Sequence, residues 1–389
     1  MQKLKLLFLI FATAMCANIA VACNKTSEIK VGAEKMDTYL PMLKDKNMAL
    51  VVNQSSLVQG TLLVDTLLTL DIKIKSILCP EHGFRGTADA GEVVNNEIDS
   101  KTGLPIISLY GSNKKPKKEQ LEGIDVVVFD LQDVGVRFYT YISTMHYVME
   151  ACAENDIQFI VLDRPNPNGH YVDGPVLEEK FKSFVGMHPI PVVHGLTVGE
   201  LAQMINVEGW LTNGVKCDLS VVKMDNWTHD TPYDLPVKPS PNLPNARSIN
   251  LYPSLCFFEP TQISIGRGTQ MPFQVIGSPL SDGDFAFTPI SIDGMSKYPK
   301  HENKQCHGLD LRISESLNCI NLEYLIKYYQ DYPEKETFFT SSKFFNLLAG
   351  NGSLQEQIKS GATESEIRES WKAKLDKYKI LRTKYLIYK

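Results

Sequence analysis

Five short strand-like runs, separated by segments of helical periodicity, most constrain how this chain folds. The runs span residues 46–53, 72–78, 105–110, 124–130 and 157–162. Strands that are apolar on both faces, such as the one around residues 126–129, are typical of parallel sheets covered by helices. Leucines at helical spacing in 62–70 and a helix-like segment at 144–154 lie between the runs, as in βαβ units. The sequence therefore predicts an α/β fold built on a doubly wound parallel sheet.

Polar residues follow three of these runs at the point where each run ends. They are Glu81 and His82 after the second run, Asp130 and Asp133 after the fourth, and Asp163 and Arg164 after the fifth. Because ligands of open α/β sheets bind outside the carboxyl ends of the strands, we expect these side chains to share one site. The alternative for the Glu81 segment is an ordinary turn whose charged residues are solvated.

Composition and motifs exclude several classes of function. The 389 residues carry a net charge of −5, with 43% apolar and 22% charged residues, so a basic face for nucleic acid is not expected. There is no G-x-G-x-x-G after the first strand, no phosphate-binding P-loop, no G-x-S-x-G and no H-E-x-x-H. The scattered cysteines have no spacing typical of zinc sites. We therefore expect neither a cofactor nor a metal ion.

The first 22 residues have the layout of a secretory signal. Lys3 and Lys5 precede an apolar stretch at 6–14, and small residues at 20–22 precede Cys23. This predicts an exported lipoprotein of the periplasm or outer membrane, acylated on Cys23, with residues 23–36 as a tether. Ordinary cleavage nearby, without a lipid, is the alternative, because Ala20 replaces the usual larger aliphatic residue.

Aromatic and amide residues surround the carboxylates of the fourth run. The segment 130–141 reads DLQDVGVRFYTY and places Phe138, Tyr139 and Tyr141 close to two carboxylates. Sugar sites combine such groups, because a pyranose ring has apolar faces and hydroxyl edges. The alternative is that these rings begin a helix and face the core.

Five ordered segments carry a resemblance to a known family. They are EHGFRG at 81–86, the segment 130–141, DRPNP at 163–167, HGLT at 194–197 and GRGT at 266–269. Together they resemble the NamZ-type exo-β-N-acetylmuramidases, formerly a family of unknown function, from about residue 53 to about 279 and more loosely beyond. The resemblance implies a Rossmann-like N-terminal domain, a smaller α+β C-terminal domain and a cleft between them. It also implies release of N-acetylmuramic acid from the non-reducing end of peptidoglycan fragments.

The resemblance and the chemistry of glycoside hydrolysis together assign roles. The family's key glutamate falls on Glu81, which we expect to be the general acid, oriented by His82. The partner carboxylate is Asp130 or Asp133, unless the 2-acetamido group of the substrate attacks instead. An arginine fork suits the lactyl carboxylate of muramic acid. The expected substrate-binding residues are Arg85, Arg137, Tyr139, Asp163, Arg164, Asn166, His194, Glu259 and Arg267.

The predicted organisation places the sheet domain at 37–185 and a domain that completes the cleft at 186–389. Thr197 and Glu200 form a capping box, so Glu200 is predicted to cap a helix and not to act as an acid. The chain departs from the family pattern at 168–170, 260, 262 and 274, which bears on substrate preference. The alternative functions are a lipoprotein that binds muropeptides without turnover, and an enzyme acting on another acyl or amide bond of the wall.

Overall fold

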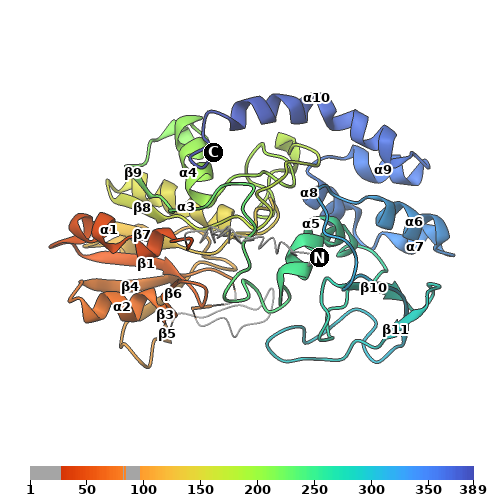
Figure 1. The fold of residues 1–389 in the computed structure, drawn as a ribbon, viewed down its shortest axis with the longest axis horizontal. Helices are drawn as coiled ribbons and strands as arrows, with labels where there is room; N and C mark the ends of the chain where they lie inside the picture. The colour runs from red at the N-terminus through yellow and green to blue at the C-terminus, as the bar shows by residue number, and fades with distance from the viewer. Residues whose placement is uncertain (1–27, 82, 85–96) are drawn as a thin grey trace, which may run out of the picture.

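A seven-stranded sheet forms the centre of the N-terminal half (Figure 1). The computed structural model describes residues 28–81, 83–84 and 97–389. The strands are β1 (Met48–Val52), β4 (Ile74–Cys79), β5 (Glu97–Ile98), β6 (Pro105–Ser108), β7 (Val126–Asp130), β8 (Gln158–Leu162) and β9 (Leu219–Val222). Their order is β5-β6-β4-β1-β7-β8-β9, and every pairing is parallel except that of β5 with β6. A hairpin of β2 (Leu57–Val58) and β3 (Thr61–Leu62) follows β1.

Helices cover both faces of this sheet, which explains why its strands are apolar throughout. Ala49 and Val51 of β1 belong to a core shared with α3 (Tyr141–Glu154) and α4 (Val198–Val207). Met48, Leu50 and Val52 point to the other face, where α1 (Met36–Leu43) and α2 (Leu63–Thr69) pack. Successive side chains of a strand alternate between faces, so a strand buried on both sides must be apolar at each position.

The side of the sheet on which the chain adds strands changes between β1 and β7. From β1 the chain proceeds outward through β4 to β6, and after β7 it proceeds the other way through β8 to β9. This is the strand order of Rossmann-type sheets, and the crevice at the reversal lies at the carboxyl ends of β1 and β7. Asp130 ends β7, and Glu81 follows β4, the other neighbour of β1.

The C-terminal part combines a small sheet with helices. Its antiparallel sheet has the order β10-β12-β11. The strands are β10 (Val275–Ser278), β11 (Phe285–Phe287) and β12 (Cys306–Asp310). The helices are α5 (Ala246–Leu255), α6 (Glu323–Asp331), α7 (Lys335–Phe338), α8 (Ser342–Ala349), α9 (Ser353–Lys359) and α10 (Glu364–Arg382). Figure 1 shows α10 running from α9 back to α4 of the sheet domain. Tyr378 of α10 donates a hydrogen bond to the carbonyl of His194, and Tyr388, which follows α10, donates one to Asp163.

The predicted fold class is confirmed, but two predicted boundaries differ from the structure. The large sheet includes β9, so the N-terminal domain extends past residue 185. The C-terminal end of the expected tether is folded: Ala33 is fully buried, and the amide of Gly32 donates to the carbonyl of Asp163 (2.8 Å). A Cβ at Gly32 would lie 2.4 Å from the amide nitrogen of Asp163, which shows how closely this segment packs.

The predictions for the N-terminus stay predictions. The signal sequence and Cys23 lie outside the described residues. Within the described ranges, no helix is long and apolar enough to cross a membrane. The six cysteines in those ranges are free thiols, and all but Cys319 are buried.

Candidate active site

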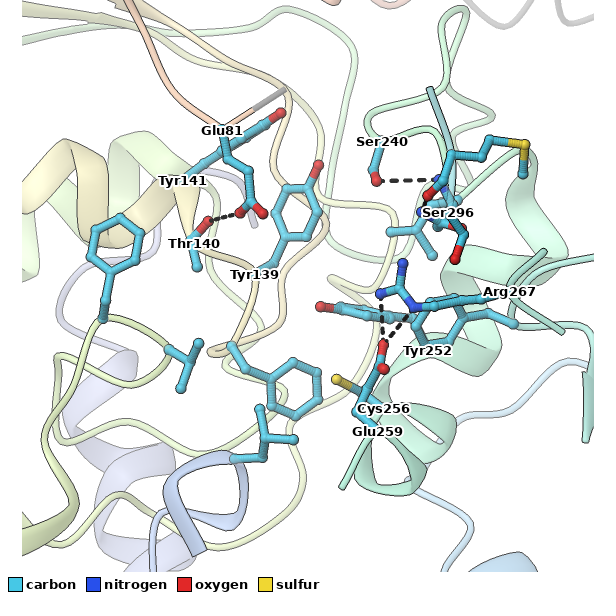
Figure 2. A pocket seen from close by; sticks show the side chains of 18 of the residues that line it. Glu81, Tyr139, Thr140, Tyr141, Ser240, Tyr252, Cys256, Glu259, Arg267 and Ser296 are labelled. Carbon is cyan, nitrogen blue, oxygen red and sulfur yellow. Dashed lines mark hydrogen bonds and ion pairs between the residues drawn. The ribbon is translucent and has the colours of Figure 1, made fainter. Parts of the chain in front are cut away.

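A cavity of about 650 Å³ lies between the sheet domain and the C-terminal part (Figure 2). Four of the predicted site residues line it: Glu81, Tyr139, Glu259 and Arg267. Glu81 and Tyr139 come from the sheet domain, and the other two from the segments after α5. The cavity therefore has a wall from each part of the chain, as the sequence predicted for the cleft.

Glu81 projects into the cavity from the loop after β4. Its Oε2 accepts a hydrogen bond from Oγ1 of Thr140 (3.2 Å), the residue directly before α3. Tyr110 is a second partner: burial, the charge of Glu81 and a hydrogen bond to Glu81 raise the pKa of the Tyr110 hydroxyl above its usual value. Two hydroxyl groups therefore hold this carboxyl group in a fixed position at the N-terminal end of a helix.

Glu259 and Arg267 form an ion pair on the opposite wall (Figure 2). Oε1 of Glu259 accepts hydrogen bonds from Nε (2.8 Å) and Nη2 (2.6 Å) of Arg267. Both side chains are partly exposed to the cavity, at 23% and 26%. Burial alone would lower the pKa of Arg267, but the Glu259 carboxylate raises it above its usual value. These two hydrogen bonds use two of the five N–H donors of a guanidinium.

Tyrosines join the two walls. Tyr139 and Tyr141 both donate hydrogen bonds to the carbonyl of Pro239 (2.9 and 3.2 Å). Tyr252 of α5 packs edge-on against Tyr139, with ring centroids 6.2 Å apart. These contacts fix the segment around Ser240 and Asn242, which also lines the cavity. The aromatic rings after β7 thus line the cavity and also belong to the hydrophobic core, so each of the two interpretations of the sequence holds in part.

Asp130 and Arg164 pair with each other beneath the cavity and do not line it. Arg164 donates from Nε to Oδ1 of Asp130 (2.5 Å) and from Nη2 to Oδ2 (2.9 Å). Asp130 is fully buried and Arg164 is 4% exposed. Nη2 of Arg164 also donates to the carbonyl of Leu57 (3.1 Å), so this bidentate pair is engaged by contacts within the protein. This arrangement differs from the expected contact with substrate and gives both residues a role in fixing β7 against β8.

Asp133 and His194 are also buried side by side outside the cavity lining. Nε2 of His194 lies 4.0 Å from Oδ2 of Asp133. Nδ1 of His194 accepts a hydrogen bond from the amide of Leu196, so the proton of the neutral ring lies on Nε2. Burial lowers the pKa of His194 to about 3 and raises that of Asp133 to about 7. Oδ1 of Asp133 has no partner in the described part of the chain.

The raised pKa of Asp133 makes a specific prediction of how stability depends on pH. A carboxyl group whose pKa is higher in the folded state stabilises the fold less as pH rises, here between about 4 and 7. Asp133→Asn removes the cost of ionising this buried carboxyl group. The free energy of unfolding of the variant, relative to that of wild type, should therefore rise by up to about 1.4 kcal/mol per pH unit between about pH 4 and 7. Urea unfolding of both proteins at several pH values measures the difference. Asp331→Asn, at an exposed position, is the control; a difference that stays flat with pH would refute the prediction.

Three further predicted residues make stabilising contacts within the protein. Arg137 is fully buried, and within the described ranges it donates to four backbone carbonyls, two of them at the end of α8. Asp163 accepts hydrogen bonds from Thr197, from the amide of Gly199 and from Tyr388, which anchors the start of α4; burial raises its pKa to about 6. Asn166 donates to the carbonyl of Leu196. The expected contacts of these residues with substrate are replaced by contacts within the protein.

The remaining predicted residues, His82 and Arg85, lie outside the described residues. The proline-rich stretch 238–245, which the sequence marks as a candidate second wall of the cleft, contributes the lining residues Ser240 and Asn242. Thr140 lies within the segment 130–141, but its contact with Glu81 was not predicted. Sequence reasoning missed Tyr110, Tyr252, Tyr298 and Phe344, which no motif distinguishes. Glu200 caps α4 as predicted, in a capping box with Thr197. In the described ranges, no group of three His, Cys, Asp or Glu side chains is arranged to hold a metal ion.

Family models match both halves of this architecture. The N-terminal model of exo-beta-N-acetylmuramidase NamZ matches residues 48–247, and the C-terminal model matches residues 250–388. The chain belongs to the NamZ family. The resemblance seen in the five sequence segments is thereby confirmed, and the two matches meet beyond the boundary that the sequence predicted.

Individual relatives agree with this membership. A curated peptidoglycan beta-N-acetylmuramidase NamZ from Bacillus subtilis (strain 168) is 39% identical, over 94% of this chain and 93% of its own length. Two solved structures of DUF1343 family proteins from Bacteroides fragilis NCTC 9343 share the fold of this NamZ-family chain. One has a TM-score of 0.85 at 45% identity and the other 0.81 at 30%, each covering 93% of this chain and 99% of its own.

Proposed function

We propose that this chain is an exo-acting glycoside hydrolase that releases terminal β-linked N-acetylmuramic acid from the non-reducing end of peptidoglycan fragments, in cell-wall turnover. The observation that carries the proposal is the position of Glu81. It projects into the cavity of a NamZ-family chain, held by two hydroxyl groups, opposite a partly exposed glutamate–arginine pair. The name of the B. subtilis relative supports the same class of substrate.

Glu81 is the general acid in this proposal. Glycoside hydrolysis requires a proton on the leaving oxygen and a second group that stabilises or attacks the anomeric carbon. Thr140 and Tyr110 orient the Glu81 carboxyl group, and a fixed position is what proton transfer to one oxygen of the substrate requires. Neither hydroxyl comes from the loop that carries Glu81, so the site is assembled from three segments of the sheet domain.

The second group is not Asp130 or Asp133 in this arrangement, because both are buried outside the cavity lining. Among the described residues, Glu259 is the other carboxylate that lines the cavity. It serves as nucleophile, as base, or as the group that polarises the 2-acetamido group of the substrate. The ion pair with Arg267 fixes the position of its carboxylate for each of these roles.

The proposal is tested with the purified mature chain and two aryl glycosides. We expect release of 4-nitrophenol from 4-nitrophenyl β-N-acetylmuraminide and much slower release from the N-acetylglucosaminide analogue. Reducing-end analysis of the products of a longer glycan distinguishes release of single terminal sugars from internal cleavage. A folded protein that binds the muraminide without turning it over would instead be a muropeptide-binding protein.

Arg267 is proposed to select muramic acid by its lactyl carboxylate. Of the four arginines that the sequence suggested for this role, Arg137 and Arg164 are buried in other contacts and Arg85 lies outside the described residues. Arg267 lines the cavity and has N–H donors beyond those that bind Glu259. Bidentate recognition of a carboxylate is what a guanidinium does best.

Replacing Arg267 should therefore reduce the preference for muramic acid. Arg267→Lys keeps a charge for Glu259 but loses the planar fork, and we expect the muraminide to glucosaminide ratio of kcat/KM to fall about tenfold or more. That corresponds to the loss of one charge-assisted hydrogen bond. Arg312→Met removes an arginine that pairs with Asp310 away from the cavity and is the matched control. An unchanged ratio in Arg267→Lys and Arg267→Met would refute this role.

We also propose that the mature chain is exported and lipid-anchored through Cys23. The support is the basic and apolar N-terminal segment followed by small residues and a cysteine. Labelling of the wild-type chain, but not of Cys23→Ala, by a radioactive fatty acid tests the anchor. Equal labelling of both chains would contradict it.

A further inference from the structure

Two exposed aromatic side chains are concentrated at the cavity. Across the described residues, the large apolar side chains left exposed are Leu70, Ile98, Val207, Leu280, Ile290, Tyr298, Ile313, Phe344 and Ile380. Seven of these nine are aliphatic, and the two aromatic ones, Tyr298 and Phe344, both line the cavity. Tyr298 is 90% exposed and Phe344 is 38% exposed. Leaving an aromatic ring in water forgoes the stabilisation that its burial would give, so their shared location suggests a ligand.

Tyr298 lies on a loop that is held firmly at its base. The loop connects β11 to β12, and Lys300 follows Tyr298 by two residues. Nζ of Lys300 donates to the carbonyls of Phe258 (3.1 Å), Glu259 (3.3 Å), Thr261 and Ile263 (2.8 Å). An ammonium group has three N–H donors, so the four carbonyls share them and saturate the group. The loop is therefore tied to the segment that carries Glu259.

Further contacts hold the loop on both sides of Tyr298. His301 hydrogen bonds through Nε2 to the carbonyl of Gln262 (2.6 Å), and the side chain of Asn242 donates to the carbonyl of Met295 (2.7 Å). Pro299 packs so closely that a Cβ at Gly268 would lie 2.6 Å from it. Tyr298 is thus an exposed ring on a loop fixed before and after it, and a ring placed in advance loses little entropy when a ligand stacks on it.

We propose that Tyr298 and Phe344 form a binding site for the sugar on the leaving-group side of the cleaved bond, a β-linked N-acetylhexosamine. This inference rests on the proposed function. If the terminal muramic acid occupies the part of the cavity between Glu81 and the Glu259–Arg267 pair, the rest of the glycan must extend toward solvent. Exposed rings at the cavity wall are placed to meet that part, and the apolar face of a pyranose stacks on an aromatic ring.

The test compares two substrates that differ only in the leaving group. One is a disaccharide with N-acetylmuramic acid β-linked to N-acetylglucosamine, and the other is methyl β-N-acetylmuraminide, whose leaving group is too small to stack. We expect Tyr298→Ala to lower the disaccharide to methyl glycoside ratio of kcat/KM by about five- to tenfold, and Phe344→Ala by about threefold, as for the loss of one stacked ring. Tyr298→Phe keeps the ring and should keep the ratio within about twofold.

Ile313→Ala is the control at an exposed apolar residue outside the cavity lining and should leave both rates unchanged. Equal losses on the two substrates, or no loss on either, would overturn the inference. Turnover of both substrates by the wild-type chain establishes the proposed function separately, and its absence would overturn that function and with it this site. Calorimetric titration of the disaccharide into Glu81→Gln, with and without Tyr298→Ala, gives a second readout: weaker binding in the double variant is expected, and unchanged binding would contradict the site.

Discussion

The Glu81→Gln variant should lose about a thousandfold or more in kcat/KM on the disaccharide of N-acetylmuramic acid β-linked to N-acetylglucosamine. The amide keeps the shape of the side chain and can still bind Thr140, but it has no proton to give to the leaving oxygen. Removing a general acid typically costs two to four orders of magnitude. The measurement is release of N-acetylmuramic acid from the disaccharide by wild type and variant.

The leaving group provides a sharper test of the same role. 4-Nitrophenolate departs with little help from an acid, so the loss in Glu81→Gln should be clearly smaller for the 4-nitrophenyl glycoside than for the disaccharide. A residue that only bound the terminal sugar would reduce both rates equally. Glu122→Gln, at an exposed glutamate of the sheet domain, is the control and should match wild type. Equal turnover by Glu81→Gln and wild type would show that Glu81 is not the general acid.

Periodicity predicted the sheet well because burial on both faces leaves a strong signal. The strand at 126–129 is apolar at each position, and the structure shows β7 between β1 and β8 with every residue buried. The strand at 219–222 joins the edge of the large sheet although it lies beyond residue 185, because the sequence of a strand does not show which sheet it pairs with. The packing of Ala33 could not be foreseen either, because it depends on β8 and β9 meeting beside it.

The position of a cavity residue was predictable where the residue closely follows a strand. Glu81 follows β4 and lines the cavity, as expected. Asp130 is the last residue of β7 and Asp163 directly follows β8, yet both bind partners within the protein. Asp130 binds an arginine, and Asp163 binds the start of α4. The sequence places polar groups at one edge of the sheet, but it does not say which of them the fold itself uses.

Residues contributed by distant segments were beyond sequence reasoning. Thr140 and Tyr110 meet Glu81 only because β4, β6 and α3 converge at one end of the sheet. Tyr298 reaches the cavity from a loop of the small sheet, held by Lys300 through backbone carbonyls that no sequence pattern records. Contacts with main-chain atoms leave no residue-type signal, so such anchors appear only in a structure.

Arg137→Met should be the most destabilising single substitution proposed for this chain. Nη1 of Arg137 donates to the carbonyls of Pro175 (2.7 Å) and Ile190 (2.8 Å), and Nη2 to those of Leu348 (2.9 Å) and Ala349 (2.7 Å). The last two end α8, where carbonyls lack partners within the helix and favour a positive charge. Each of the four buried acceptors left without a donor costs about 1–3 kcal/mol. Because Met also removes the cost of burying a charged guanidinium, we expect a smaller net loss of roughly 3–5 kcal/mol in the free energy of unfolding.

The backbone around Arg137 shows that the guanidinium joins the two parts of the chain. Gly350 has a φ of 75°, and a Cβ there would lie 2.5 Å from Nη2 of Arg137, so glycine is required for the close approach. Urea unfolding measures the loss, with Arg312→Met as the surface control expected to stay within about 0.5 kcal/mol of wild type. Arg137→Lys keeps the charge, but one ammonium cannot supply the two-nitrogen fork, and an intermediate loss is expected. If Arg137→Met unfolded at the urea concentration of the surface control, the guanidinium would contribute no net stability to the contact between the domains.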